Sequence, residues 1–97
     1  MPLFLIRREQ RGTSQEELEA GAFRAASCTS NFEGMRWITS YFDVEGDAVF
    51  CIYEARSAED IANHALGARI PCDEIRPVIQ LHPEEYGAPA ADAALPR

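Results

Sequence analysis

The chain has 97 residues, 46% of them hydrophobic and 26% charged, and its formal net charge is −7. This length accommodates one domain with one core, and the composition is typical of a folded globular protein rather than a disordered chain. The acidic balance argues against nucleic acid and anionic membranes as partners, because both require a basic surface.

The cysteines and the N-terminus indicate the cellular compartment in which the protein is found. The N-terminal apolar run is too short for a signal sequence, and no stretch approaches the length of a membrane span. Three widely spaced cysteines, Cys28, Cys51 and Cys72, form no CxxC motif. We therefore expect reduced thiols rather than a disulfide framework, and a cytoplasmic protein.

The first part of the chain predicts a strand followed by a helix. Residues 3–9 form an apolar run that ends in charges, as in a strand. Thr13 and Ser14 each precede a glutamate by three residues, so either can cap a helix that runs to about Cys28. One side of this helix carries small residues beside a leucine, which predicts close packing on a sheet: Leu18, Gly21, Ala22, Ala25 and Ala26.

The middle of the chain predicts a hairpin and a second helix. Residues 35–42 are rich in aromatic and β-branched side chains, which favour a strand. Residues 43–47 contain the glycine of a hairpin connection, and residues 48–55 form the returning strand. Ser57 precedes an aspartate by three residues and caps a helix that continues to about Gly67.

The last predicted strand covers residues 75–82, where Pro77 indicates an edge position. The composition then turns to proline, alanine and glycine, so we expect a domain over residues 1–86 and a flexible tail over 87–97. The element order predicts an α+β, ferredoxin-like βαββαβ fold, in which two helices cover one face of a four-stranded antiparallel sheet.

The hairpin also predicts a homodimer. If Phe42 opposes Ala48 across the turn, then Trp37 opposes Tyr53, and Tyr41 joins them in an aromatic cluster on one face. The other face of the hairpin is substantially apolar as well. Since helices cover only one face of such a sheet, a second copy of the chain is the simplest cover for the other.

Several stretches together show a family pattern: residues 1–4, 34–41, 50–55, 63–65, 70–71 and 82–84. The most specific are Arg-Trp-x-x-Ser-Tyr from Arg36 and Phe-Cys-x-Tyr-Glu-Ala from Phe50. The pattern resembles a small bacterial family catalogued as a domain of unknown function, over about residues 2–86. A characterised representative binds nickel and has a dimeric ferredoxin-like fold, so the resemblance implies both properties. The chain departs from the family in offering His82 where an acidic residue is usual, and in its extra cysteines.

His64 is the first candidate for chemistry. It lies near the apolar stripe of the second helix, either as a packed histidine or as a metal ligand or proton-transfer group. As a metal ligand it would need Cys51 or Glu54 within reach. Those two side chains point to opposite faces of a regular strand, so they do not easily share one ion. Cys51 can instead be a core residue, and Glu54 can instead pair with Arg36 across the hairpin.

Two main hypotheses follow. The first is a homodimeric binding protein for a divalent transition metal, nickel by resemblance, held by His64, Cys51 and Glu54. The alternative is a cofactor-independent dimeric ferredoxin-like enzyme, an oxygenase or isomerase acting on a small organic substrate. No standard catalytic motif is present, so we assign no catalytic residue and favour binding over catalysis. The candidate ligand-binding residues are Trp37, Tyr41, Tyr53, Glu54 and His64.

These hypotheses differ in what they require of the structure. A metal site requires His64 and two or more further donors to converge on one point. An enzyme requires an enclosed pocket with His64 or Glu54 in its wall. A third possibility, a plain interaction module, requires neither.

Overall fold

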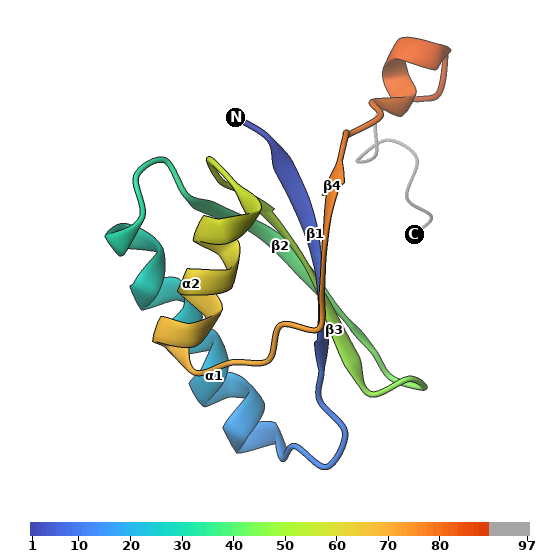
Figure 1. The fold of residues 1–97 in the computed structure, drawn as a ribbon. Coiled ribbons are helices and arrows are strands. Elements are labelled where there is room, and N and C mark those ends of the chain that lie inside the picture. Colours follow the sequence, from blue (N-terminus) through green and yellow to red (C-terminus); the bar gives the residue numbers. More distant parts are fainter. Residues whose placement is uncertain (90–97) are drawn as a thin grey trace.

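Two α-helices lie on one side of a four-stranded antiparallel sheet in the computed structural model, which describes residues 1–89 (Figure 1). The sheet has the order β2-β3-β1-β4, which with the element order confirms the predicted ferredoxin-like βαββαβ fold. The elements in chain order are β1 (Leu3–Glu9), α1 (Gln15–Cys28), η1 (Thr29–Asn31), β2 (Arg36–Asp43), β3 (Ala48–Glu54), α2 (Ala58–Ala68), β4 (Glu74–Val78) and η2 (Pro83–Tyr86). Neither α-helix is long and apolar enough to cross a lipid bilayer within this described part.

Serine side chains cap both α-helices, as the sequence predicts. Ser14 Oγ accepts a hydrogen bond from the backbone N–H of Glu17 at 3.1 Å, which selects the later of the two expected starts for α1. Ser57 Oγ accepts in the same way from the N–H of Asp60 at 3.1 Å. Each cap satisfies a backbone donor that the first helical turn cannot pair internally.

The last strand is shorter than predicted. β4 ends at Val78 instead of continuing to residue 82, and it is an edge strand, as Pro77 indicates. Beyond it the chain runs away from the sheet to η2, and Ile79, Leu81 and Tyr86 are exposed (Figure 1). Most of the predicted flexible tail, residues 90–97, lies outside the described residues.

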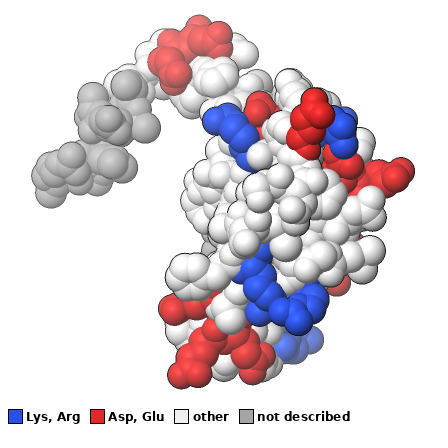
Figure 2. Space-filling model, turned by 90° about the vertical axis from the view of Figure 1, so that its left-hand side faces the viewer, with Lys and Arg blue, Asp and Glu red and all other residues white. Residues whose placement is uncertain are grey.

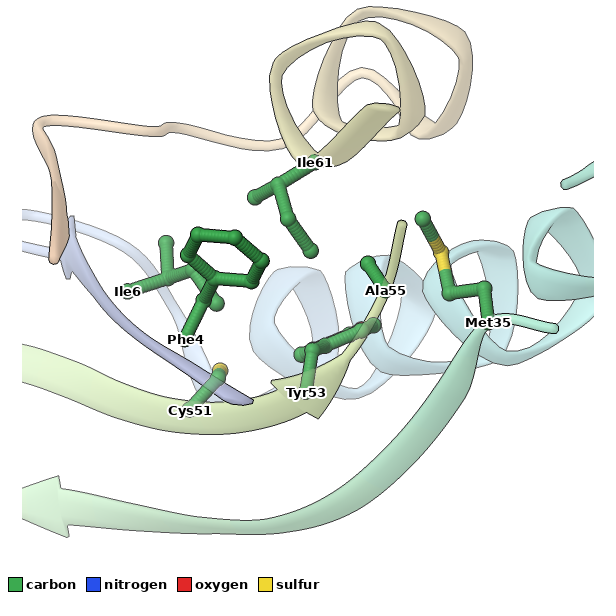
Figure 3. Close-up of a cluster of buried hydrophobic side chains, with 7 residues drawn as sticks. All are labelled: Phe4, Ile6, Met35, Cys51, Tyr53, Ala55 and Ile61. Atoms are coloured by element: carbon green, nitrogen blue, oxygen red, sulfur yellow. The ribbon is translucent and has the colours of Figure 1, made fainter. Parts of the chain in front are cut away.

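The hydrophobic core lies between α2 and the sheet (Figure 3). Ile61 points from α2 toward Phe4 and Ile6 of β1, while Cys51 and Tyr53 rise from β3 beside them. Because strand side chains alternate between faces, the buried positions of β1 are every second residue and continue past Phe4 and Ile6 to Arg8. A charged side chain therefore lies on the same face of the sheet as the core.

The register of the β2–β3 hairpin corrects one prediction. Trp37 opposes Tyr53 as expected, but the pairing shifts by one residue between Trp37 and Thr39, so that Phe42 opposes Val49 and not Ala48. This β-bulge inserts one residue into β2, which moves the following side chains to the other face. Tyr41 consequently pairs with Phe50 and does not share a face with Trp37.

The face of the sheet turned away from the helices is substantially apolar. Leu5 pairs with Ile52 on this face, and Phe50 pairs there with Tyr41. Leu5, Phe50 and Ile52 are half-buried in the single chain, and Tyr41 is 67% exposed. We call this surface the open face.

Candidate functional site

His64 is fully buried in α2, at 0% exposure. Its Nε2 lies 2.8 Å from the carbonyl oxygen of Ala25 in α1. A carbonyl only accepts hydrogen bonds, so Nε2 carries the hydrogen and Nδ1 keeps its lone pair. Nδ1 has no hydrogen-bond partner among residues 1–89. The imidazole ring also packs against Tyr53, with ring centroids 5.2 Å apart, and against Phe32 at 6.0 Å.

Burial lowers the pKa of His64 below its ordinary value of 6.5, although the hydrogen bond to Ala25 opposes this shift. The side chain is therefore neutral near pH 7. In this position His64 joins the two helices and fills space beside Tyr53, which is the packed alternative expected from its sequence context.

Cys51 and Glu54 lie on opposite faces of the sheet, as expected. Cys51 is buried on the helix side, where its Sγ accepts hydrogen bonds from Arg8 Nε at 3.4 Å and from Ser40 Oγ at 2.9 Å. Glu54 forms the predicted ion pair with Arg36 at 3.0 Å on the open face. Residues 1–89 contain no group of three or more His, Cys, Asp or Glu side chains placed to hold one metal ion. His64, Cys51 and Glu54 thus do not fit a three-donor nickel site within one chain.

A cavity of about 370 Å³ lies between α1 and the sheet. Its α1 wall includes Leu18, Gly21, Ala22 and Ala25, the small-residue side that we expected to pack closely on the sheet. That expectation is wrong for the sheet: Gly21 and Ala25 are buried, with Gly21 next to Ile70, but the cavity separates this side of α1 from the strands. The remaining lining comes from the sheet and from the segments next to the two helices: Arg8, Gln10, Thr13, Glu17, Arg24, Trp37, Ser40, Phe42, Val49, Cys51, Tyr53, Arg69, Ile70 and Pro71.

The attachment of α1 explains this open space. Arg24 of α1 donates hydrogen bonds to the carbonyl oxygen of Ala68 at 2.7 Å and to that of Arg69 at 3.2 Å, both at the end of α2. Together with the bond between His64 and Ala25, these contacts hold α1 to α2. α2 supplies the core contacts with the sheet, and α1 lies next to α2, where it forms one wall of the cavity.

A chain of hydrogen bonds orders the cavity floor. Trp37 Nε1 donates to Ser40 Oγ at 2.8 Å, and Ser40 Oγ donates to Cys51 Sγ at 2.9 Å. The indole of Trp37 stacks on the ring of Tyr53, with centroids 6.0 Å apart and planes 6° from parallel. The bulge in β2 makes this chain possible, because it brings Ser40 opposite Cys51 on the face that already carries Trp37.

Arg8 and Tyr53 each bring a buried donor without a partner to this cavity. Arg8 is only 3% exposed, and its Nη1 donates to the carbonyl oxygen of Pro71 at 2.8 Å. Its Nη2 and the hydroxyl of Tyr53 have no hydrogen-bond partner within residues 1–89. The guanidinium carbon of Arg8 lies 5.7 Å from the centroid of the Tyr53 ring. Burial raises the pKa of Tyr53 to about 12, against the opposing charge of Arg8, so the phenol stays protonated at neutral pH.

The charge around the cavity is positive although the chain is acidic. Three arginines line it, Arg8, Arg24 and Arg69, against one acidic residue, Glu17. Figure 2, which views the helix side, shows basic side chains gathered next to a group of acidic ones on the lower part of the body. The cavity therefore favours an anionic or neutral molecule over a cation.

The structure brings together only some of the residues singled out from the sequence. Trp37, Cys51 and Tyr53 line the cavity, whereas His64, Glu54 and Tyr41 do not. Sequence reasoning missed Arg8. Its signal was available in the alternation of β1, which places this residue on the same face as two core positions.

Comparisons with known proteins agree with the fold and point to a family. A family model described as nickel responsive protein SCO4226-like matches residues 4–78 of the chain. The crystal structure of SCO4226 from Streptomyces coelicolor A3(2) superposes with a TM-score of 0.70 at 20% sequence identity, and the match covers 82% of this chain and 99% of that one. At this identity the superposition shows a shared fold. No curated protein gives a significant match.

Proposed function

The chain belongs to the family of nickel responsive SCO4226-like proteins, and from this premise we propose that it is a homodimeric binding protein whose ligand occupies the cavity between α1 and the sheet. The observation that carries the proposal is the cavity itself, whose wall contains two fully buried donors with no partner in residues 1–89. Folded proteins leave few such groups unpaired, and a bound ligand is one way to satisfy them. Binding is favoured over catalysis because His64 and Glu54, the expected acid–base groups, lie outside the cavity.

A pair of matched variants tests this site. Ala25→Leu places a larger side chain in the cavity, whereas Ala20→Leu makes the same change at an exposed position of α1 outside the cavity lining. Trp37 is the single tryptophan and lines this cavity and a second hollow beside Phe23, so its fluorescence detects binding and the variants assign the binding to the cavity. We expect a fragment screen to yield compounds that perturb Trp37 fluorescence in the wild type and in Ala20→Leu, but not in Ala25→Leu. If no compound binds, or if every compound binds both variants equally, the cavity is not the ligand site.

A second candidate function is binding of a divalent metal, because the family name points to nickel. Donors from one described chain do not suffice, so such a site would require donors from a second copy. Of the three proposed ligands His64, Cys51 and Glu54, Glu54 lies on the open face and is the one that a partner there would approach.

Calorimetry with nickel, zinc, cobalt and copper tests the metal proposal. The variants are Glu54→Gln, Cys51→Ser and His64→Gln, and the exposed histidine variant His82→Ala serves as control. Saturable nickel binding that is lost in one of the three and retained in the control supports a metal site. Binding no tighter than about millimolar would remove it.

The open face supports the homodimer. It presents Leu5, Phe50 and Ile52 on the side of the sheet opposite both helices. Ile52→Asp introduces a charge there, and Leu66→Asp introduces one on the outer side of α2, where Leu66 is 76% exposed. We expect sedimentation velocity to show a dimer for the wild type and Leu66→Asp, and a monomer for Ile52→Asp. A monomeric wild type would refute the dimer. The free state of all three cysteines is in keeping with the proposed cytoplasmic location.

A further inference from the structure

We propose that the ligand of the cavity is a small organic carboxylate, bound through its head group by Arg8 and Tyr53 and through its apolar body by Trp37. This inference rests on the proposed function, that the cavity is the ligand site, and adds the chemical class of the ligand. Three features of the cavity wall carry it.

The first feature is the buried guanidinium of Arg8. Its Nε and Nη1 donate to Cys51 Sγ and to the Pro71 carbonyl oxygen, so the group is held in place without a carboxylate partner. Arginine stays protonated in proteins, and a buried charge without a counter-ion is strongly unfavourable. Other arginines of the described chain have acidic partners at the surface: Arg7, Arg36, Arg56 and Arg76. No Asp or Glu in residues 1–89 forms an ion pair with Arg8. A bound carboxylate would supply such an acidic partner for Arg8.

The second feature is the pairing of two donors. Arg8 Nη2 and the Tyr53 hydroxyl are both unpartnered, and both belong to residues of one cavity wall. The high pKa of Tyr53, about 12, keeps its hydroxyl a donor at neutral pH. A carboxylate has two acceptor oxygens and no donor, so it can accept from both groups once the side chains that cover these two atoms in the structure move aside. A metal cation would instead meet the positive charge of Arg8, Arg24 and Arg69.

The third feature is the size and the apolar lining of the cavity. A volume of about 370 Å³ falls within the range typical of small-molecule sites, and it exceeds the needs of a simple inorganic anion. Next to the polar groups the wall carries Trp37, Val49, Leu18 and Ile70, against which an apolar or aromatic body can pack. Inorganic phosphate shares the head-group chemistry but gains nothing from these walls, so an organic acid is the better fit.

The test measures binding of benzoate, benzamide and inorganic phosphate through Trp37 fluorescence and calorimetry. Benzoate and benzamide have the same ring and differ in charge, so their ratio isolates the head group. We expect benzoate to bind about ten- to a hundredfold more tightly than benzamide, which is the usual gain from hydrogen bonds to a charged group. Phosphate should bind more weakly than benzoate. Phosphate binding as tight as benzoate would overturn the organic part of the inference.

Two variants assign the head group. Tyr53→Phe removes a hydroxyl that has no partner in residues 1–89, so the fold keeps its hydrogen bonds while benzoate affinity falls about two- to tenfold. Tyr41→Phe makes the same change on the open face and should leave the affinity unaltered. Arg8→Met removes the charge and should abolish the preference for benzoate over benzamide, provided that circular dichroism shows a folded protein. If Arg8→Met does not fold, Tyr53→Phe tests the head-group assignment, and an unchanged benzoate affinity in Tyr53→Phe would overturn it.

The outcomes separate this inference from the proposed function. If benzamide binds as tightly as benzoate, and Ala25→Leu abolishes both, the cavity is the ligand site but its ligand is not a carboxylate. If benzoate binds wild type and Ala25→Leu equally, the cavity is not the site and both proposals fail. Absence of benzoate binding up to about 10 mM, while other fragments occupy the cavity, overturns the carboxylate class alone.

Discussion

Replacing His64 by alanine separates a packed histidine from a metal ligand. The substitution removes a fully buried ring from its contacts with Tyr53 and Phe32, which by analogy with other large-to-small core changes costs about 2–4 kcal/mol. It also removes the hydrogen bond to the Ala25 carbonyl, worth about 1 kcal/mol. Removing the unpartnered Nδ1 returns a similar amount, since a buried acceptor without a donor is unfavourable. We therefore expect a net loss of about 3 kcal/mol in the free energy of unfolding.

Urea unfolding followed by circular dichroism and by Trp37 fluorescence measures this loss. With a slope of about 1.5 kcal/mol/M, typical of a domain of this size, the midpoint should fall by about 2 M. His82→Ala is the matched control, since the other histidine is exposed and should change stability by less than about 0.5 kcal/mol. A loss below about 1 kcal/mol for His64→Ala, together with loss of nickel binding, would refute the packing argument and assign His64 to a metal site.

Three further predictions follow from the described contacts. Burial lowers the pKa of His64 below 6.5, so His64 binds a proton more readily in the unfolded chain than in the folded one. The stability of the wild type should therefore fall relative to that of His64→Gln as the pH drops from about 7 to 5. Equal pH slopes of the two proteins in urea titrations would contradict this prediction. Ser57→Ala removes the cap of α2 and should cost about 1 kcal/mol by the same assay, whereas an unchanged midpoint would show that the cap is dispensable. Glu54→Gln breaks an ion pair whose Arg36 partner is 67% exposed, so thermal unfolding should show that the free energy of unfolding falls by less than about 1 kcal/mol. A larger decrease would mean that Glu54 is buried, as in a dimer.

The accuracy of the site prediction depended on the range of the interactions involved. Trp37 and Tyr53 were expected to be neighbours because direct cross-strand pairing follows from the hairpin, and the structure confirms this pair. Tyr41 was placed with them on the assumption of a regular strand. The bulge between Trp37 and Thr39 breaks that regularity, and no local residue pattern in β2 predicts the bulge.

Arg8 illustrates a signal that was present but unused. A charge at an inward position of β1 conflicts with burial, and such conflicts between pattern and chemistry are common at functional sites. His64 shows the opposite case, because its position on the apolar stripe of α2 indicated burial and left its role open. The structure places it against Ala25 and Tyr53, which line the cavity, while His64 itself is not part of the lining.

The sequence by itself determined the order of the strands and helices, the two serine caps and the edge position of β4, because these depend on interactions between residues close in the chain. Only the tertiary structure decided that α1 is held by α2 and stands off the sheet, and that Arg8 and Tyr53 meet at the resulting cavity. The small-residue side of α1 is compatible with close packing and with an open space alike. The choice between them depends on long-range contacts, such as that of Arg24 with the end of α2, which no local pattern specifies.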